Sequence, residues 1–243
     1  MALILGIDVG ASGIKGAVVD TTTGALTTER FKLPTPKPAT PQAIADTFTA
    51  IVQHFGWTGN VGCGFPAIVK NGVAHSAANI HKSWIGINAE ELLSEASGCP
   101  VKMLNDADAA GIAEVKYGFA KDQKGVAMLL TIGTGIGSAL FMDGKLMPNT
   151  ELGHLFIRGQ EAEHFAADSV RKKEKLSWDE WAQRFNEYLL HLEFLFSPSV
   201  FILGGGASKY FEQYKHNFTV KAQVVTAQFL NNAGLIGAAY YAR

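Results

Sequence analysis

Short apolar runs separated by glycine-rich turns dominate the pattern of hydrophobic and polar positions. Leu3–Val9 and Ile14–Asp20 are two such runs, and the glycines between them indicate a turn that joins two strands. Val101–Leu104 and Val200–Leu203 are two more, and each leads directly into polar or glycine residues. Strands of this kind, alternating with helical segments, are typical of an α/β protein.

Two segments carry the helical period instead. After a proline-rich connection, Thr40 and Pro41 form a helix start signal, and apolar residues then recur at spacings of four, three and four. A second helix is predicted from about Trp178 to Phe196, opened by the capping-box pattern of Ser177 and Glu180. We interpret the aromatic stripe along this second helix as core packing, because its spacing follows one helical face.

One local pattern occurs twice, about half the chain apart. Gly13–Val19 resembles Gly135–Phe141, and each copy follows an apolar strand and another glycine. This interval predicts two related halves rather than a short-period repeat. We therefore expect an α/β fold of two lobes around a central cleft, with an N-terminal lobe at 1–108, a C-terminal lobe at 109–230, and a C-terminal helix at about 231–243 that packs back on the N-terminal lobe.

Composition narrows the class of protein. The 243 residues suit one large domain or two small ones, and 21 Lys plus Arg against 22 Asp plus Glu leave a net charge of −1. This near-neutrality argues against a nucleic-acid binder, which would have a basic excess. No apolar stretch approaches the ~18 residues of a membrane span, and no secretory signal is recognisable. With two cysteines and no cysteine metal spacing, we expect a cytoplasmic protein without membrane or nucleic-acid partners.

The first glycine turn carries residues suited to phosphate. Gly10 and Gly13 let the backbone approach an anion closely, while Ser12 adds a hydroxyl and Lys15 a positive charge. Asp8, at the end of the preceding strand, is suited to hold Mg²⁺ through water, because magnesium takes few protein carboxylates beside waters and phosphate oxygens. The alternative from this segment alone is a hairpin turn with a surface aspartate.

The second glycine turn repeats the chemistry of the first. It contains Thr131, Gly133, Thr134 and Gly135, so that hydroxyls again accompany glycines after an apolar strand. Two such turns in a duplicated frame favour phosphate binding over a pair of plain turns.

Asp106 follows a strand and precedes an alanine-rich helix. It could cap that helix, or it could act as a general base that accepts a proton from a substrate hydroxyl. Asp108 better suits a plain charge in the first helical turn. Local sequence does not separate these roles.

Glu151 and His154 place an acid and an imidazole three residues apart, which suits hydrogen bonds to neighbouring sugar hydroxyls. A surface glutamate and a satisfied histidine are an equal alternative. A zinc site would need further ligands. The basic run Arg171–Lys175 is interpreted as a solvated linker, although a polyanion could use it.

An ordered set of motifs spans nearly the whole chain, and together these motifs resemble the sugar kinases of the ROK family, within the hexokinase and actin-like ATPase group. The similarity is closest to the polyphosphate-using glucokinases of that family. The motifs are Asp8–Gly16, Gly64–Pro66, Asn79–Trp84, Leu104–Ala110, Leu130–Gly137, Asn149–His154, Glu161–His164, Leu176–Trp178, Asn186–Leu189, Leu195–Pro198, Gly204–Lys209 and Asn231–Gly234.

The resemblance implies two RNase H-like lobes, a homodimer and a set of site residues. Asp106 matches the catalytic base. The positions that match sugar ligands are Asn79, Lys82, Asn105, Glu151, His154 and Glu163. Those that match the two phosphate turns are Asp8, Gly10, Ser12, Gly13, Lys15, Thr131, Gly133, Thr134 and Gly135, and the nucleotide-side loop matches Gly204, Gly205 and Gly206. The cysteine-rich zinc motif of many ROK proteins is missing here, so no zinc is expected.

The activity that the resemblance implies is phosphorylation of glucose at its 6-hydroxyl, with Mg²⁺ as cofactor and inorganic polyphosphate, and ATP as well, as donor. An ATP-dependent glucokinase or mannokinase is the alternative. A non-catalytic sugar sensor on the same fold would not need the Asn105–Asp106 pair, and an actin-like filament protein would not explain Glu151 and His154.

Overall fold

The computed structural model describes residues 2–78 and 80–243, and the chain divides into two compact units. The first unit is Met1–Tyr117 with Asn232–Arg243, and the second is Gly118–Asn231. The lobe boundary expected at 108/109 falls inside helix α3 (Asp106–Lys116). All of α3 belongs to the first unit, because it packs along the C-terminal helix α7 (Ala233–Tyr241).

The first unit is built on a sheet with the strand order β3-β2-β1-β5-β8, in which β4 also pairs with β2. Strand β1 is antiparallel to β2 and parallel to β5, and β5 is parallel to β8. The carboxyl ends of β1, β5 and β8 therefore meet at one edge. The strands are β1 (Leu3–Val9), β2 (Ile14–Asp20), β3 (Ala25–Leu26), β4 (Phe31–Leu33), β5 (Val61–Phe65) and β8 (Val101–Asn105).

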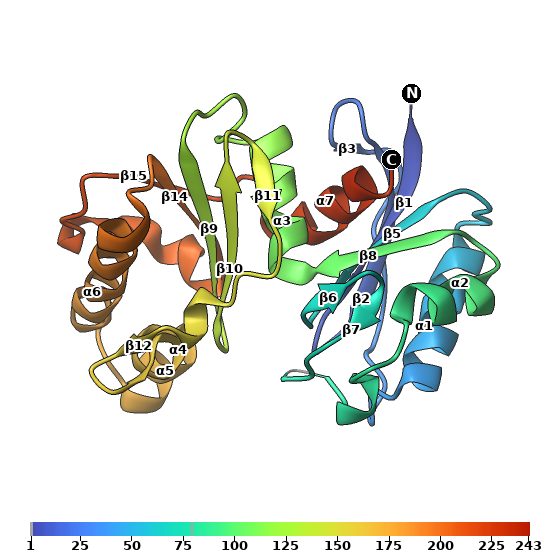
Figure 1. Ribbon diagram of the computed structural model, residues 1–243, viewed down its shortest axis with the longest axis horizontal. Helices are drawn as coiled ribbons and strands as arrows, with labels where there is room; N and C mark the ends of the chain where they lie inside the picture. Colours follow the sequence, from blue (N-terminus) through green and yellow to red (C-terminus); the bar gives the residue numbers. More distant parts are fainter. Residues whose placement is uncertain (1, 79) are drawn as a thin grey trace. The chain divides into compact units, whose positions relative to one another are not determined.

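Helices cover both faces of this sheet. Figure 1 shows α1 (Pro41–His54) and α2 (Ala89–Ser97) on one side and α3 with α7 on the other. The predicted start of α1 is confirmed, since Thr40 caps the helix by accepting from the Ala43 N–H and Pro41 is its first residue. A small hairpin of β6 (Val69–Lys70) and β7 (Val73–Ala74) and the 3₁₀ turn η1 (Lys82–Trp84) complete the unit.

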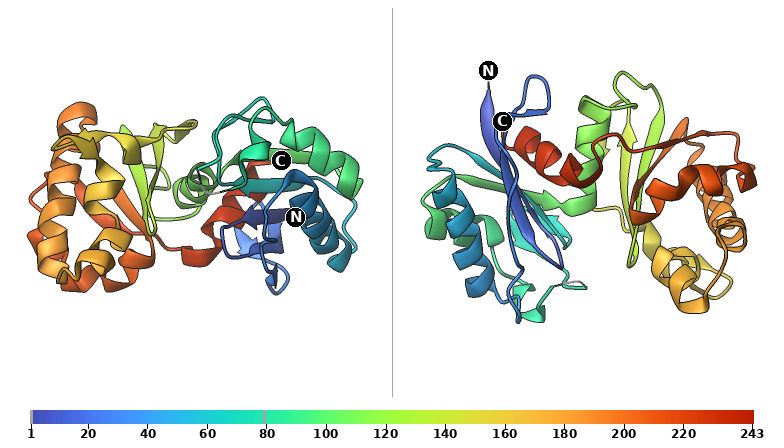
Figure 2. Two further views of the ribbon diagram at one scale, coloured as in Figure 1. Left: turned by 90° about the horizontal axis from the view of Figure 1, so that it is seen from below. Right: turned by 180° about the vertical axis from the view of Figure 1, so that it is seen from behind.

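The second unit repeats the arrangement of the first. Its sheet has the order β11-β10-β9-β14-β15, again with an antiparallel pair beside two parallel strands (Figure 2). Two related α/β halves, each with a glycine turn between its first two long strands, are thus confirmed. The strands are β9 (Val126–Ile132), β10 (Ile136–Met142), β11 (Lys145–Met147), β14 (Val200–Gly205) and β15 (Gln223–Thr226).

Helix α6 (Trp178–Phe196) has the predicted bounds and packs on the second sheet. Both hydrogen bonds of its capping box form: the Ser177 hydroxyl accepts from the Glu180 N–H at 3.2 Å, and the Glu180 carboxylate accepts from the Ser177 N–H at 2.8 Å. Trp181, Phe185 and the other central members of its stripe are buried, as expected for core packing.

The remaining elements are short. They are η2 (Leu152–His154), β12 (Phe156–Ile157), β13 (Gln160–Glu161), α4 (Ala162–Ala166), α5 (Asp168–Glu174), η3 (Gly206–Gln213), η4 (Lys215–Asn217) and η5 (Leu230–Asn232). Within residues 2–78 and 80–243, no helix combines the length and the apolar character needed to cross a bilayer.

The approach of α7 to α3 makes a stability prediction. A Cβ added at Gly237 would lie 1.7 Å from the carbonyl oxygen of Ala109. Replacing a glycine inside a helix with alanine ordinarily stabilises it by up to about 1 kcal/mol, whereas overpacking typically costs about 1–3 kcal/mol. We expect the cost to exceed the gain, so that Gly237→Ala lowers the free energy of unfolding by about 1–2 kcal/mol, measured by equilibrium unfolding in urea.

The matched control is Gly206→Ala, because a Cβ added at Gly206 would meet no atom within 4 Å. This variant should change the free energy of unfolding by less than about 0.5 kcal/mol. Equal stabilities of the two variants would contradict the close approach of α7 and α3.

Candidate active site

The first glycine turn joins β1 to β2 and brings the predicted phosphate residues of the first unit together. It is closed by a hydrogen bond from the Gly10 N–H to the Gly13 carbonyl, 3.1 Å long. The strand register places Asp8 opposite Lys15, and their side chains form an ion pair of 2.8 Å. Ser12 is exposed in the turn. A hydroxyl, an ammonium and a carboxylate thus gather at the carboxyl end of β1.

Asp8 and Asp106 lie on either side of Gly64, at the edge where β1, β5 and β8 end. A Cβ added at Gly64 would lie 3.7 Å from the Asp8 Oδ1 atom and 3.8 Å from the Asp106 Cα atom. Because residue 64 is glycine, no side chain separates the two acids. The predicted base therefore lies beside the predicted phosphate turn.

Asn105, rather than Asp106, caps helix α3. The Asn105 Oδ1 atom accepts from the N–H groups of Ala107 at 2.8 Å and Asp108 at 3.1 Å, and its Nδ2 atom donates to the Ala67 carbonyl at 3.3 Å. Asp106 is the first residue of the helix rather than its N-cap, although its Oδ1 atom also accepts from the Ala107 N–H at 2.8 Å. The Asn105 amide holds the strand end and the helix start together, which positions Asp106 as the first residue of α3.

The second glycine turn is held by residues that the sequence did not single out. The Ser169 N–H donates to the Gly133 carbonyl at 3.1 Å, and the Ser169 hydroxyl donates to the Thr134 carbonyl at 2.6 Å. On the other side, the Glu163 carboxylate accepts from the Ile136 N–H at 3.3 Å. A Cβ added at Gly135 would lie 2.3 Å from the Glu163 Oε2 atom, so a side chain here would displace that carboxylate. The turn and the predicted sugar ligand Glu163 are in direct contact.

The segment that carries Glu151 is fastened to the same turn. Ser138 is buried in β10; its hydroxyl donates to the Thr150 carbonyl and accepts from the Leu152 N–H at 3.0 Å. A Cβ added at Gly153 would lie 2.1 Å from the Ile136 carbonyl oxygen. These contacts fix η2 against the start of β10. Sequence reasoning missed Ser138 because its partners are non-local.

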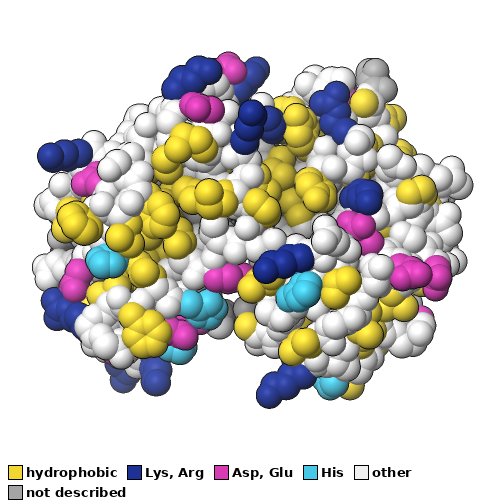
Figure 3. Space-filling model, viewed as in Figure 1, with side chains coloured by type: hydrophobic (Ala, Val, Ile, Leu, Met, Phe, Trp, Pro, Cys, Tyr) yellow, Lys and Arg dark blue, Asp and Glu magenta, His cyan; other side chains and the backbone are white. Residues whose placement is uncertain are grey.

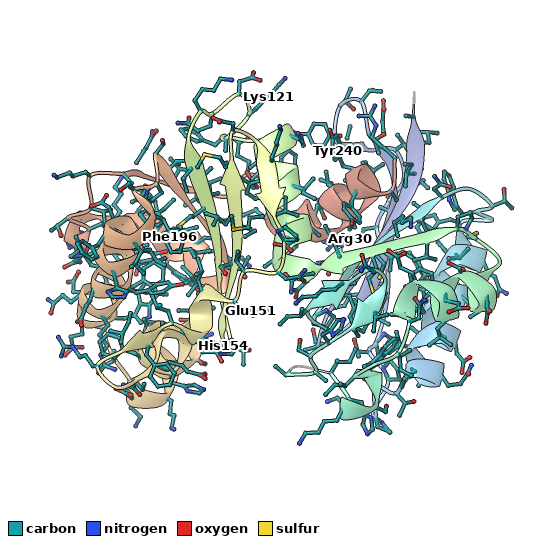
Figure 4. All side chains as sticks on the ribbon, in the orientation of Figure 1. Arg30, Lys121, Glu151, His154, Phe196 and Tyr240 are labelled. Carbon is teal, nitrogen blue, oxygen red and sulfur yellow. The ribbon has the colours of Figure 1, made fainter. Side chains whose placement is uncertain are left out.

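His154 is surrounded by three carboxylates. Its Nδ1 atom lies 3.0 Å from a Glu161 oxygen and 3.9 Å from a Glu163 oxygen, and its Nε2 atom lies 3.9 Å from a Glu151 oxygen. Figure 4 shows Glu151 and His154 close together beside the lower ends of β9 and β10, and Figure 3 shows histidine and acidic side chains gathered on this part of the second unit. The structure thus brings together three predicted sugar ligands and adds Glu161.

These contacts shift two pKa values. The hydrogen bond to Glu161, with the nearby negative charges, raises the pKa of His154 above its usual value. Burial raises the pKa of the Glu151 carboxyl, and the His154 imidazole partly offsets that effect. The carboxylates around His154 therefore favour the charged form of its imidazole.

Among the described residues, side chains of this cluster could also hold a metal ion. His154, Glu161 and Glu163 present ligand atoms within 4.8 Å of one another. Cys63 and Cys99 are buried free thiols outside this group. One imidazole with two carboxylates is not the thiolate-rich set of a structural zinc site, and the expected absence of zinc stays a prediction.

The predicted nucleotide-side loop adjoins the second glycine turn, because the strand register pairs Gly204 with Thr131 and Gly205 with Ile132. Gly204 and Gly205 end strand β14, and Gly206 begins η3. Gly205 has a φ of 77°, and a Cβ there would meet the backbone of Ile132 at 2.4 Å. Lys82 is exposed in η1 of the first unit. Asn79 lies outside the described residues.

The ROK family model matches residues 4–168 of the chain, which carry both glycine turns, Asp106 and the His154 cluster. The chain belongs to the ROK family. It is 48% identical to the polyphosphate glucokinase of Mycobacterium tuberculosis (strain CDC 1551 / Oshkosh) over 96% of this chain and 89% of the relative. It is 27% identical to the glucokinase of Streptomyces coelicolor over 100% of this chain and 98% of that protein.

Solved ROK structures have the same fold. The inorganic polyphosphate/ATP-glucomannokinase of Arthrobacter sp. strain KM matches with a TM-score of 0.94 and 46% identity, covering 99% of this chain and 98% of that one. A ROK family glucokinase from Streptomyces griseus, in complex with glucose and AMPPNP, matches with a TM-score of 0.83 and 25% identity, covering 99% of each chain. The fold is therefore the actin-like ATPase and hexokinase type expected from the motifs.

The His154 cluster makes a pH prediction. A histidine whose pKa is raised by folding stabilises the protein below its unfolded pKa of ~6.5, and that contribution is lost as pH rises through the folded pKa. We therefore expect His154→Gln to lower the melting temperature more at pH 6 than at pH 9, as followed by circular dichroism.

His191→Gln is the matched control, since His191 is exposed on α6 and forms no ion pair with any described residue. Its effect on the melting temperature should be the same at both pH values. A His154→Gln effect that grows between pH 6 and pH 9 would contradict the electrostatic account.

Proposed function

We propose that the protein phosphorylates glucose at the 6-hydroxyl with inorganic polyphosphate as donor, and that ATP serves as a second donor. The observation that carries this proposal is the position of Asp106 beside Asp8 and the first glycine turn, with Gly64 between the two acids. A base next to a phosphate turn suits transfer of a phosphoryl group to a hydroxyl. The high identity to polyphosphate glucokinases supports glucose and polyphosphate as the substrates.

Asp106 is the proposed general base. It accepts the proton of the 6-hydroxyl as that oxygen attacks the terminal phosphorus, and the bond from that phosphorus to the rest of the donor breaks. The Asn105 cap holds Asp106 at the helix start, so the carboxylate is positioned before substrate binds. Such preorganisation lowers the entropic cost of aligning the reactants.

Glu151, His154 and Glu163 are the proposed ligands of the other sugar hydroxyls, together with Asn79, Lys82 and Asn105 as the resemblance implies. Carboxylates accept from hydroxyls, and an imidazole can donate or accept. The 3.0 Å contact between His154 and Glu161 holds the imidazole next to the carboxylates of Glu151 and Glu163. Substrate specificity between glucose and mannose depends on the directions of these groups.

The two glycine turns are the proposed binding elements for the donor phosphates, and Gly204–Gly206 the proposed loop on the nucleotide side. The Asp8 carboxylate fits a magnesium ion bound mainly by water and phosphate oxygens, because it is one carboxylate at a strand end beside a turn suited to phosphate. When bound there, Mg²⁺ would neutralise negative charge on the phosphates. Lys15 holds the Asp8 carboxylate in place and adds a positive charge of its own.

A homodimer in the cytoplasm is also proposed, as the resemblance implies. Helix α6 supports self-association because it exposes Leu190, Phe194 and Leu195, with Phe194 84% exposed. Sedimentation velocity measures the oligomeric state directly, and a monomer at micromolar concentration would rule the dimer out.

The donor is tested with glucose held constant. We expect glucose 6-phosphate to form from ATP-free polyphosphate in magnesium buffer, and the apparent affinity for polyphosphate to fall more steeply with salt than that for ATP, because a longer polyanion makes more electrostatic contacts. Activity with ATP and none with polyphosphate would instead indicate the ATP-dependent glucokinase.

The base is tested by Asp106→Asn. Removing a general base typically lowers turnover by about 10²–10⁴-fold, while binding of glucose, measured by calorimetry, should change little. The control is Asp46→Asn, which removes a carboxylate from the exposed face of α1 in the same unit and should leave turnover unchanged. Near-normal turnover of Asp106→Asn would show that another group takes the proton.

A further inference from the structure

Charged side chains form a row across three strands beside the first glycine turn. The register places Asp8 on β1 opposite Lys15 on β2, and Lys15 opposite Lys32 on β4. Asp8 pairs with Lys15, but Lys32 has no carboxylate oxygen within 4.0 Å among residues 2–78 and 80–243. Like charges directly opposite each other destabilise a sheet. The row therefore holds one more positive charge than its own carboxylate balances.

Lys32 reaches the turn itself. A Cβ added at Gly13 would lie 2.1 Å from the Lys32 Cε atom and 3.0 Å from its Nζ atom. The ammonium group thus lies against the backbone of Gly13, in the turn that the Gly10–Gly13 hydrogen bond closes. Two lysines, from two neighbouring strands, face one turn.

A pocket of about 370 Å³ begins at this turn and lies wholly within the first unit. The Thr35 hydroxyl donates to the Gly10 carbonyl at 2.5 Å, which fastens the segment after β4 to the turn. The pocket is lined by Val9, Gly10, Ala11, Thr35, Pro36, Lys37, Ala39, Pro66, Ala78, Ile80 and His81. Its volume is in the range of roughly 300–1,000 Å³ that is usual for small-molecule sites.

The side chains that line this pocket favour a negatively charged ligand. Lys37 contributes an ammonium and His81 an imidazole, and none of the described residues that line the pocket is acidic. Like Lys32, Lys37 has no carboxylate oxygen within 4.0 Å in the described part of the chain. Cations at the turn and again in the pocket suit an anion that carries charge along its whole length. The adenosine part of ATP is uncharged and gains nothing from them.

We propose that Lys32 and Lys37 bind phosphate units of inorganic polyphosphate beyond those that the first glycine turn holds. This inference rests on the proposed function, and it assigns the donor specificity to two lysines outside the phosphate turn. Polyphosphate neutralises the unbalanced charge beside Lys15 and continues into the pocket past Lys37.

The test is the double variant Lys32→Gln/Lys37→Gln, which keeps most of the length of both side chains and removes their charges. We expect the KM for long-chain polyphosphate to rise roughly tenfold, as suits the loss of two charge-assisted contacts, and its salt dependence to become shallower. The KM for glucose and the turnover number should change less than about twofold. The KM for ATP should change less than that for polyphosphate, and Lys32→Arg/Lys37→Arg should restore polyphosphate binding.

Lys70→Gln is the matched control, because Lys70 is an exposed lysine of the same unit that does not line this pocket. It should leave all three KM values unchanged. If the wild type uses polyphosphate and the double variant retains its KM and salt dependence, the lysine assignment is wrong and the proposed function stands.

A binding measurement separates the two proposals further. Fluorescently labelled polyphosphate is titrated against wild type and double variant, without glucose, and followed by anisotropy. If the wild type transfers from ATP alone, the proposed donor is wrong, and this titration still decides the lysines. Weaker binding by the double variant supports their role, and equal binding overturns it.

Discussion

The first unit depends on how closely helix α7 approaches the backbone of its sheet. Cβ atoms added at Gly6 and Gly62 would lie 2.0 and 1.8 Å from carbonyl oxygens of α7, so no side chain fits between the helix and strands β1 and β5. This contact brings the last helix of the chain against its first strand. Gly234, at the start of α7, would place a Cβ 2.6 Å from the Asp8 carboxylate. The position of a candidate phosphate-site residue is therefore set from the opposite end of the sequence.

In the second unit, glycines also allow close contacts, and these contacts hold the segments around His154 together. Gly135 admits the Glu163 carboxylate, and Gly153 admits the carbonyl of Ile136. As a result, the second glycine turn, η2 and helix α4 are packed as one assembly around His154. Any change in the turn would move the proposed sugar ligands with it. Close backbone contact thus joins the proposed donor-binding turn to the proposed sugar ligands of this unit.

Charge is divided between the two candidate regions according to the substrates proposed for them. In the row across β1, β2 and β4 beside the first turn, Lys15 and Lys32 accompany the single carboxylate of Asp8, which suits an anionic donor. Around His154, carboxylates outnumber the imidazole, which suits hydroxyl groups that donate hydrogen bonds.

The sequence by itself determined the local elements and the family. The start of α1 at Pro41 and the full extent of Trp178–Phe196 follow from caps and spacing, which act over a few residues. The tertiary structure decided what depends on partners far away in the chain. It made Asn105 the cap of α3, it brought Glu161 to His154, and it paired Lys32 with Lys15. The physical reason is that strand register and helix packing select these neighbours, and neither is encoded in the spacing of residues along one segment.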